Sequence, residues 1–415
     1  MKAADAIDAV WRIESARLIA GLARIVGDVG LAEDLAQDAL VAALEQWPES
    51  GVPDNPGAWL MATAKHRAID HLRRRKMQDT KHEHLGRELE ERQVSPESDL
   101  VEAIDDQVGD DLLSLIFTAC HPVLSTDARV ALTLRLVGGL TTDEIARAFL
   151  VPKATIQQRI VRAKRTLAAA RVPFEVPRGA DLASRLESVL EVIYLIFNEG
   201  YSATAGADWV RPALCEDAVR LGRILAELAP KEAEVHGLVA LMEIQASRMR
   251  ARVGPGGAPI LLLEQDRGRW DHLLIGRGLA ALERAESLAG GYGPYALQAA
   301  IAACHARARS AEETDWTRIV ALYDALAQLT PSPVIELNRA VALGMAFGPA
   351  AGLEVIDTIR SDPSLAGYHL LPSVRGDLLA KLGRFEEARA ELARAAELTA
   401  NVRERELLIK KREAL

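Results

Sequence analysis

The apolar side chains between residues 153 and 170 recur at a spacing that a helix accommodates and a strand does not. Ile156, Ile160, Ala163 and Leu167 are separated by four, three and four residues, which places them in one stripe along a helix. No acidic residue occurs in this stretch, and the side chains left outside the stripe are Lys153, Thr155, Gln157, Gln158, Arg159, Arg162, Lys164 and Arg165. The spacing therefore predicts an amphipathic helix with a cationic outer face.

A second, shorter helix is expected just before this one. Thr141 or Thr142 can cap a helix whose first turn is acidic. A tight connection follows, and Pro152 is acceptable in the first turn of the next helix. Two short helices joined in this way are typical of a helix-turn-helix, whose second helix can enter the major groove of DNA. The alternative is a helix pair with a solvated basic face.

An acidic and a basic helix are expected side by side near the N-terminus. In residues 28–47 the pattern places Leu31, Leu35, Ala39 and Leu44 inward and Glu33, Asp34, Gln37 and Asp38 on an acidic outer face. Residues 55–76 read as a helix entered through Pro56, with Trp59, Leu60, Ala64, Ile69 and Leu72 available for packing and Lys65, Arg67, Arg73, Arg74, Arg75 and Lys76 outward. Such a bundle can hold a protein on one face and a nucleic-acid backbone on the other.

The remaining segments also indicate an all-α protein. Aromatic residues make up only 4% of the 415 residues and hydrophobic residues 49%, and Ala, Leu, Arg and Glu dominate, as in helical proteins. Residues 78–108 are acidic and polar, contain the pair Ser95-Pro96 and read as a linker. Ala- and Leu-rich helices follow from Val172 onward. The net charge of −9 averages over these unlike segments.

In order and spacing, these segments resemble regions 2 and 4 of bacterial sigma-70 factors of the extracytoplasmic function class. The resemblance rests on residues 28–47, 56–76 and 141–167. It implies region 2 over 1–77, an acidic linker over 78–108, region 4 over 109–171 and a helical extension over 172–415. It also implies a subunit that brings core RNA polymerase to promoter DNA.

The resemblance assigns three groups of residues. Core polymerase would bind Asp34, Leu35, Gln37 and Asp38. The −10 element would be melted and read by Asn55, Trp59, Lys65, His66, Arg67, Arg73, Arg74, Arg75 and Lys76, with the loop from Pro48 to Pro56. The −35 element would be read by Lys153, Thr155, Gln157, Gln158, Arg159, Arg162, Lys164 and Arg165. His66 and Ala154 stand where many relatives carry Asn and Gly, and Gln157-Gln158 replaces a usual Lys-Ser, which predicts an altered −35 preference.

The C-terminal extension contains a pattern similar to a tetratricopeptide repeat. Gly376, Ala388, Leu392, Ala395 and Ala400 fall on the positions where such repeats bring paired helices together, although Ala400 replaces the usual Pro, and Ala340 and Gly352 suggest an earlier copy. The chain thus resembles the group of sigma factors with such an extension, which is associated with small DGPF-type (YCII-related) proteins. A protein of that type is the expected additional partner.

Other functions find less support. The segments 195–211 and 261–271 are rich in polar residues and allow three interpretations: a catalytic site, a contact or sensing surface, or helix-end structure. No established catalytic motif accompanies them, so we expect no enzyme and no cofactor. Cys120, Cys215 and Cys304 lack metal-ligand spacing, and no signal peptide or membrane span is expected, which favours a cytoplasmic protein. The alternative function is a repeat-containing helix-turn-helix regulator that senses a ligand or partner through its extension.

Overall fold

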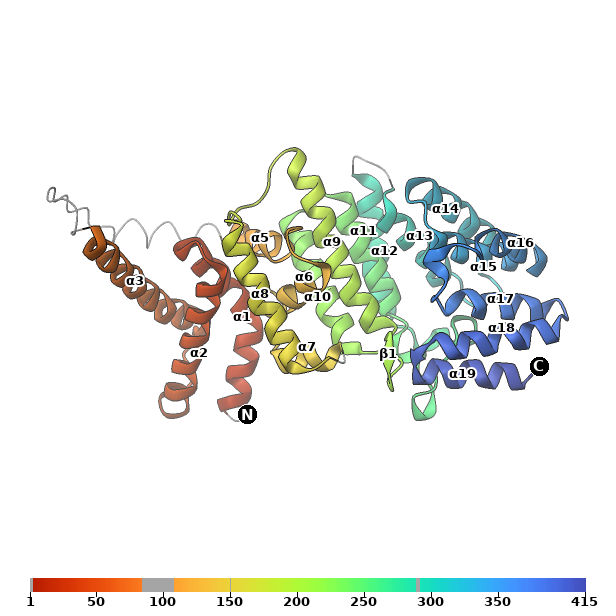
Figure 1. Cartoon of the computed structure of the whole chain (residues 1–415), viewed down its shortest axis with the longest axis horizontal. Coiled ribbons are helices and arrows are strands. Elements are labelled where there is room, and N and C mark those ends of the chain that lie inside the picture. Colours follow the sequence, from red (N-terminus) through yellow and green to blue (C-terminus); the bar gives the residue numbers. More distant parts are fainter. Residues whose placement is uncertain (1–2, 84–107, 150, 289–291) are drawn as a thin grey trace. The chain divides into compact units, whose positions relative to one another are not determined.

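The computed structural model describes residues 3–83, 108–149, 151–288 and 292–415, with only the backbone described for 3–6, 8, 9, 12, 74–83, 108–110, 147 and 180. These residues are almost entirely helical (Figure 1), which confirms the predicted fold class. The chain divides into two compact units, Met1–Val192 and Ile193–Leu415. Within the described residues, no helix is long and apolar enough to span a membrane.

The first unit begins with three helices that pack on one another, α1 (Ala3–Val26), α2 (Val29–Ser50) and α3 (Pro56–Glu83). Asp28 caps α2 by accepting a hydrogen bond of 2.9 Å from the amide of Leu31. The buried side of α2 is formed largely by alanines, which let the helices approach closely: Ala32, Ala36, Ala39, Ala42 and Ala43. Leu60 and Ala64 of α3 are buried as predicted.

Two predictions for α2 were wrong. Glu33, expected on the outer face, is only 2% exposed, whereas Leu44, expected inside, is 47% exposed. The alanine line sets the buried side of the helix, and Leu44 falls outside it. Glu33 lies at the edge of this line, where side chains from other helices of the same unit cover it.

The loop before α3 is shorter than predicted. Pro48 was expected to begin it but lies inside α2, which continues to Ser50. Pro48 has no amide to donate to the carbonyl of Leu44, and the last turn is held by the Ser50 hydroxyl, which donates to the carbonyl of Gln46 at 2.9 Å. Gly51 then ends the helix at a φ of 84° and donates its amide to Trp47.

Four helices of the first unit follow: α5 (Val108–Ala119), α6 (Thr126–Leu136), α7 (Thr142–Ala148) and α8 (Lys153–Ala169). Between the two helical groups, α3 runs on to Glu83, into the segment expected as a linker. The rest of the predicted linker, 84–107, lies outside the described residues.

The first unit extends past the expected end of region 4 at residue 171. Helix α9 (Ala180–Tyr201) begins in this unit, and Arg185 donates to the carbonyl of Phe117 at 2.8 Å. Ser188 donates to the carbonyl of Cys120 at 2.7 Å. The first half of α9 is therefore anchored to α5.

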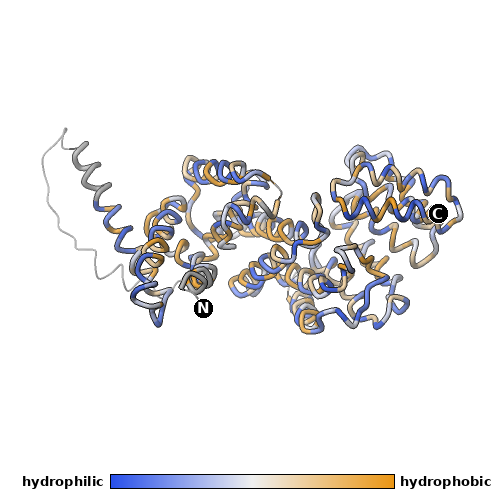
Figure 2. The backbone as a smooth tube through the Cα atoms, turned by 90° about the horizontal axis from the view of Figure 1, so that it is seen from below, coloured by the Kyte–Doolittle hydropathy of each residue, from blue (hydrophilic) through white to orange (hydrophobic). Residues whose placement is uncertain are grey.

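The second unit is a succession of helices in which neighbours along the chain pack against each other. They are α10 (Pro212–Leu228), α11 (Ala233–Ala246), α12 (His272–Ser287), α13 (Pro294–Arg307), α14 (Trp316–Leu329), α15 (Pro333–Phe347), α16 (Pro349–Ile359), α17 (Leu370–Lys381), α18 (Phe385–Leu398) and α19 (Val402–Glu413). Short 3-10 turns lie at Met249–Ala251, Pro255–Gly257, Leu262–Glu264, Arg267–Arg269 and Pro363–Leu365. Figure 2 shows polar and apolar residues alternating along these helices, as expected where one side faces a neighbour.

Small residues set the contacts of the last helix pairs, as the repeat pattern predicted. A Cβ atom on Gly352 of α16 would lie 2.5 Å from the carbonyl oxygen of Ala340 in α15, so only glycine permits this approach. Gly376 of α17 likewise faces Leu392 of α18. Ala400 differs from the pattern because it is exposed and belongs to a short strand.

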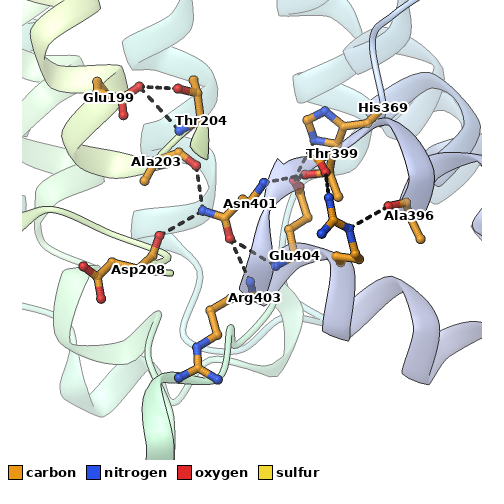
Figure 3. A network of polar contacts seen from close by, with 11 residues as sticks. Glu199, Ala203, Thr204, Asp208, His369, Ala396, Thr399, Asn401, Arg403 and Glu404 are labelled. Atoms are coloured by element: carbon orange, nitrogen blue, oxygen red, sulfur yellow. Dashed lines mark hydrogen bonds and ion pairs between the residues drawn. The ribbon is translucent and has the colours of Figure 1, made fainter. Parts of the chain in front are cut away.

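That strand connects the C-terminal end of the second unit with its beginning. Strand β2 (Ala400–Asn401) pairs in parallel with β1 (Ala205–Gly206), which follows α9. The buried Asn401 side chain donates to the carbonyls of Ala203 and Asp208, each at 2.9 Å (Figure 3). The array of helices is therefore closed by a polar contact between its two ends.

Candidate nucleic-acid interface

The helix-turn-helix forms as predicted from α7 and α8. The hydroxyl of Thr141 accepts a hydrogen bond of 3.2 Å from the amide of Glu144, and the Glu144 carboxylate accepts from the Thr141 amide at 2.8 Å. This reciprocal pair is a capping box and fixes the start of α7. Pro152 is the N-cap of α8, whose buried residues are the four of the predicted stripe: Ile156, Ile160, Ala163 and Leu167.

The outer face of α8 is cationic and amide-rich. Gln157, Gln158, Arg162 and Arg165 are exposed, and Thr155 is half-buried. Two further predicted residues form ion pairs with exposed acidic groups: Lys153 with Asp143 at 2.7 Å and Arg159 with Asp127 at 2.9 Å. Exposed pairs of this kind contribute at most about 1 kcal/mol, so both cations remain available to a stronger anion such as phosphate.

Lys164 differs from the other residues of this face. Its side chain is 19% exposed, and its ammonium group forms an ion pair with the buried carboxylate of Glu33 in α2. Glu33 also accepts a hydrogen bond of 2.6 Å from Nε of Arg135 in α6. In this structure Lys164 therefore faces protein and not solvent.

The described part of the basic helix α3 has an exposed polar side. His66 is exposed and its Nδ1 lies 2.8 Å from the carbonyl of Ala62, and Lys65 is half-buried. Arg67 forms an exposed ion pair with Asp38 of α2 at 3.3 Å. Arg73 is exposed, while the side chains of Arg74, Arg75 and Lys76 lie outside the described residues.

Two residues assigned to the −10 element also have structural contacts. Asn55 accepts a hydrogen bond of 3.0 Å from the amide of Ala58 and so caps α3. The rings of Trp59 and Trp47 meet edge to face with their centroids 5.3 Å apart. These contacts fix the position of the short loop at residues 51–55 relative to α2 and α3.

The residues assigned to polymerase binding do not form one exposed surface. Asp34 and Asp38 have side chains that are 75% and 60% exposed, whereas Leu35 is buried at 5%. Gln37 is half-buried and donates to Glu33 at 2.7 Å. Of the four assigned residues, Asp34 and Asp38 are the exposed acidic ones, and Leu35 acts as a core residue.

The two polar segments of the extension meet around three arginines. Arg252 lies over the ring of Tyr201 at 3.7 Å, Arg267 lies over Trp270 at 5.0 Å, and the buried Arg248 lies near both rings. Burial lowers the pKa of Arg248, and the positive charge of Arg252 adds to this effect. These cation–π contacts join the end of α9 to the segment between α11 and α12.

The carboxylates of the same segments serve as structural partners. Glu199 forms an ion pair with Arg211 and accepts from the Thr204 hydroxyl at 2.9 Å. Asp266 accepts from the amide of Gly268, and Asp271 caps α12 by accepting from two amides. These contacts favour the interpretation as helix-end structure.

Comparisons with known proteins agree with this geometry. Sigma-70 region 2 matches residues 13–77, sigma-70 region 4 matches residues 114–167, and a family of unknown function, DUF6596, matches residues 185–286. No solved structure matches the chain.

Three relatives illustrate the similarity. An uncharacterized protein of Rhizobium meliloti is 44% identical over 385 residues, covering 92% of this chain and 89% of its own. The probable RNA polymerase sigma-C factor of Mycobacterium bovis is 30% identical over 151 residues, covering 35% of this chain and 72% of its own. The probable ECF RNA polymerase sigma factor SigI of Mycobacterium tuberculosis is 30% identical over 177 residues, covering 41% and 58%.

The fold and the cationic recognition helix α8 thus define a transcription protein with a helix-turn-helix. A separate helical module, α1 to α3, precedes the helix-turn-helix in the chain. The chain belongs to the sigma-70 family of RNA polymerase sigma factors, in the extracytoplasmic function class. Membership implies core RNA polymerase and promoter DNA as partners. The match to region 2 does not favour a regulator that uses the helix-turn-helix alone.

Sequence reasoning missed Arg135 and misplaced Glu33. The alanine spacing 32, 36, 39 and 43 was a signal for the buried side of α2, and it places Glu33 at its edge. For Arg135, which lies 102 residues from its partner, the sequence offers no comparable signal.

Proposed function

We propose that this sigma factor binds core RNA polymerase through α2, melts and reads the −10 element with α3 and its preceding loop, and reads the −35 element with α8. The observation that carries this proposal is the presence of two cationic helix faces on separate modules matching regions 2 and 4. The modules correspond to residues 1–77 and 109–171, with the linker 78–108 between them.

The composition of α8 suits readout of duplex DNA. Exposed Gln157 and Gln158 can form bidentate hydrogen bonds to adenine, and Arg162 and Arg165 can bind guanine or phosphate. Lys153, Thr155 and Arg159 lie on the same helix and would contribute phosphate contacts. Lys164 would join them once its ion pair with Glu33 is broken.

The composition of α3 suits strand opening. Separating and unstacking base pairs costs a few kcal/mol, and a cationic surface that holds the displaced phosphates offsets this cost. Lys65, His66, Arg67 and the run Arg73 to Lys76 would supply that surface. The loop at residues 51–55 ends at Asn55, and Trp59 follows it in α3. We assign this loop as the site that receives an unstacked base.

Asp34 and Asp38 are the proposed electrostatic contacts with core polymerase. Both are exposed, and a cationic surface of the polymerase would be attracted to them. Gln37 lies on the same side of α2, and the buried Leu35 would hold α2 in place by packing in the core. We further infer that the protein acts in the cytoplasm, where the polymerase is, and that it is not itself an enzyme.

For the extension, we propose a regulatory role through contact with another protein. Closed helical arrays with small residues at the helix contacts present extended surfaces to partners. A small DGPF-type (YCII-related) protein is the proposed partner. Truncation after Ala170 should change transcription or its regulation, and unchanged transcription and regulation would contradict this role.

Run-off transcription tests the proposed residue roles. Purified protein with core polymerase should start at a promoter that core polymerase alone ignores. The double variant Arg74→Ala with Arg75→Ala should weaken open-complex formation more than −35 binding, whereas Gln158→Ala should change the preference among −35 sequences. Equal losses at both steps from each variant would contradict this division between α3 and α8.

A further inference from the structure

A pocket of about 610 Å³ opens between α10, the end of α11 and the start of α12 in the second unit. The 3-10 turn that follows α11 completes its wall. Most of the lining side chains are apolar, among them Val210, Val219, Met249, Val253 and Leu274. A pocket of this size and lining is typical of sites for small organic molecules. All of its lining residues fall within 185–286, the range that matches the family of unknown function.

Four charged side chains also line this pocket, and two of them already have protein partners. Arg223 lies 2.7 Å from the carboxylate of Glu243, and Asp271 accepts hydrogen bonds from two amides at the start of α12. Arg250 and Glu216 are exposed, and within the part of the chain that the structure describes neither side chain has an ion pair or a hydrogen bond. One cation and one anion of the pocket are therefore available to a ligand.

Two buried arginines of the same chain segment decide which charge the pocket favours. Arg248 is 5% exposed and Arg252 is 9% exposed, and no carboxylate of the described residues forms an ion pair with either. The Nε atoms of both also lack a hydrogen-bond partner there. Burial raises the pKa of the Cys215 thiol to about 12, and the charge of Arg252 opposes this rise. Since Cys215 lines the pocket, the charge of Arg252 acts at the pocket wall.

The electrostatic potential in the pocket is therefore positive. The rings that contact Arg248 and Arg252 are neutral and do not balance their charges. Buried charges are seldom left without a counter-charge, because removing a charge from water is strongly unfavourable. Water screens the exposed Glu216 far more than it screens the two buried arginines. An anion in the pocket would supply a counter-charge that the protein itself does not provide.

We propose that this pocket binds an amphipathic organic anion, a small molecule with an apolar body and a carboxylate. The apolar body lies against Val219, Met249 and Leu274, and the carboxylate pairs with Arg250, whose guanidinium can donate two parallel hydrogen bonds to it. The proposal goes beyond the function in transcription. It gives the extension a ligand site in addition to its proposed protein contact.

Three probes with a similar alkyl chain test the charge of the ligand: octanoate, octanol and octyltrimethylammonium. Isothermal titration calorimetry of the full-length protein without polymerase measures their affinities. Octanoate should bind most tightly and octyltrimethylammonium most weakly. Equal affinities for the three probes, or tightest binding of the cation, would overturn the proposal whatever the protein does in transcription. Tight octanoate binding by a protein that never confers initiation would leave this site standing and contradict only the proposed function.

Charge variants test which side chains select the anion. Arg250→Gln removes the proposed anchor and should weaken octanoate about fivefold while octanol binds as before. Arg277→Gln is the matched control, because it removes the same charge from an exposed position of α12 outside the pocket lining and should keep the wild-type affinities. Glu216→Gln should strengthen octanoate and weaken octyltrimethylammonium. Arg248→Met keeps the apolar stem without the buried charge and should weaken octanoate by a smaller factor than Arg250→Gln does.

A variant that fills the pocket tests its location. Met249→Trp places a large ring in the space of the apolar body and should abolish binding of both octanoate and octanol. Retained octanoate binding in a folded Met249→Trp variant, or unchanged octanoate affinity in either Arg250→Gln or Arg248→Met, would overturn the proposal. Arg250 is exposed and has no structural partner among the described side chains, so Arg250→Gln keeps the test decisive if Met249→Trp does not fold.

Discussion

Replacing Asn401 tests how the two ends of the second unit are held together. Its amide group donates to the buried carbonyls of Ala203 and Asp208, and its side-chain oxygen accepts from the amides of Arg403 and Glu404 at the start of α19 (Figure 3). Asn401 is 1% exposed, so water cannot replace these bonds. Asn401→Ala removes all four hydrogen bonds at once.

The expected loss follows from the number and burial of these bonds. The two hydrogen bonds to the carbonyls of Ala203 and Asp208 contribute about 1 kcal/mol each. The two bonds to the amides of Arg403 and Glu404 form the cap of α19, and the loss of a helix cap costs about 1 kcal/mol. The Asn401→Ala variant should therefore lose about 3 kcal/mol of local stability, which makes exchange of the protected amides about a hundredfold faster. Native-state hydrogen exchange of residues 203–208 and 399–404 measures this, and amides of the first unit serve as the internal control.

Asn401→Asp is the matched variant. Aspartate retains an oxygen that can cap α19, but it places a carboxylate oxygen against two carbonyl oxygens where Asn401 donates. We expect exchange at residues 203–208 to be at least as fast as in Asn401→Ala. Wild-type exchange in Asn401→Asp would mean that Asn401 acts only as a cap, and wild-type exchange in both variants would refute the reasoning altogether.

Three further predictions concern single residues. Gly352→Leu forces α16 away from the Ala340 carbonyl and should lower the free energy of unfolding by about 2 kcal/mol or more, seen as a lower urea midpoint; an unchanged midpoint would contradict the close contact. Burial and the charges of two nearby arginines lower the pKa of His305 to about 3, so the unfolded chain takes up a proton from about pH 6.5 downward and the folded one does not. Stability is therefore lost as the pH falls from 6.5 towards 3, by at most about 1.4 kcal/mol per pH unit, and His305→Phe should flatten this part of the pH dependence in urea titrations at pH 7 and pH 5. Thr141→Ala removes the cap of α7 and should cost about 1 kcal/mol, visible as faster amide exchange in α7, while equal exchange would show that Glu144 alone fixes the helix start.

The elements that depend on local chemistry were predictable. The stripe of α8 is buried at all four expected positions, and Thr141, one of the two predicted candidates, caps α7. The small residues of the last helix pairs also follow the predicted spacing, as Gly352 shows. In each case the determining interactions join residues close in sequence or follow a fixed period.

The errors in α2 have a common cause. Hydrophobicity placed Leu44 inward and charge placed Glu33 outward, but the alanine line sets the packing side of the helix. Small side chains bring helix backbones closer together than leucine would. This closer packing determines how α2 is rotated about its own axis, and so which of its side chains are buried. A hydropathy pattern weights Leu44 above Ala43 and therefore misjudges that rotation.

The sequence by itself determined where most helices lie, which face of α8 is cationic and which family the chain resembles, because caps, periodicity and charge act over a few residues. Only the tertiary structure decided which charges neutralise one another. Glu33 meets Arg135 and Lys164 across more than 100 residues of chain, and Asn401 meets Ala203 across 198. Such contacts depend on how whole helices pack, and the energy of a buried charge or amide depends on the partner that packing brings to it.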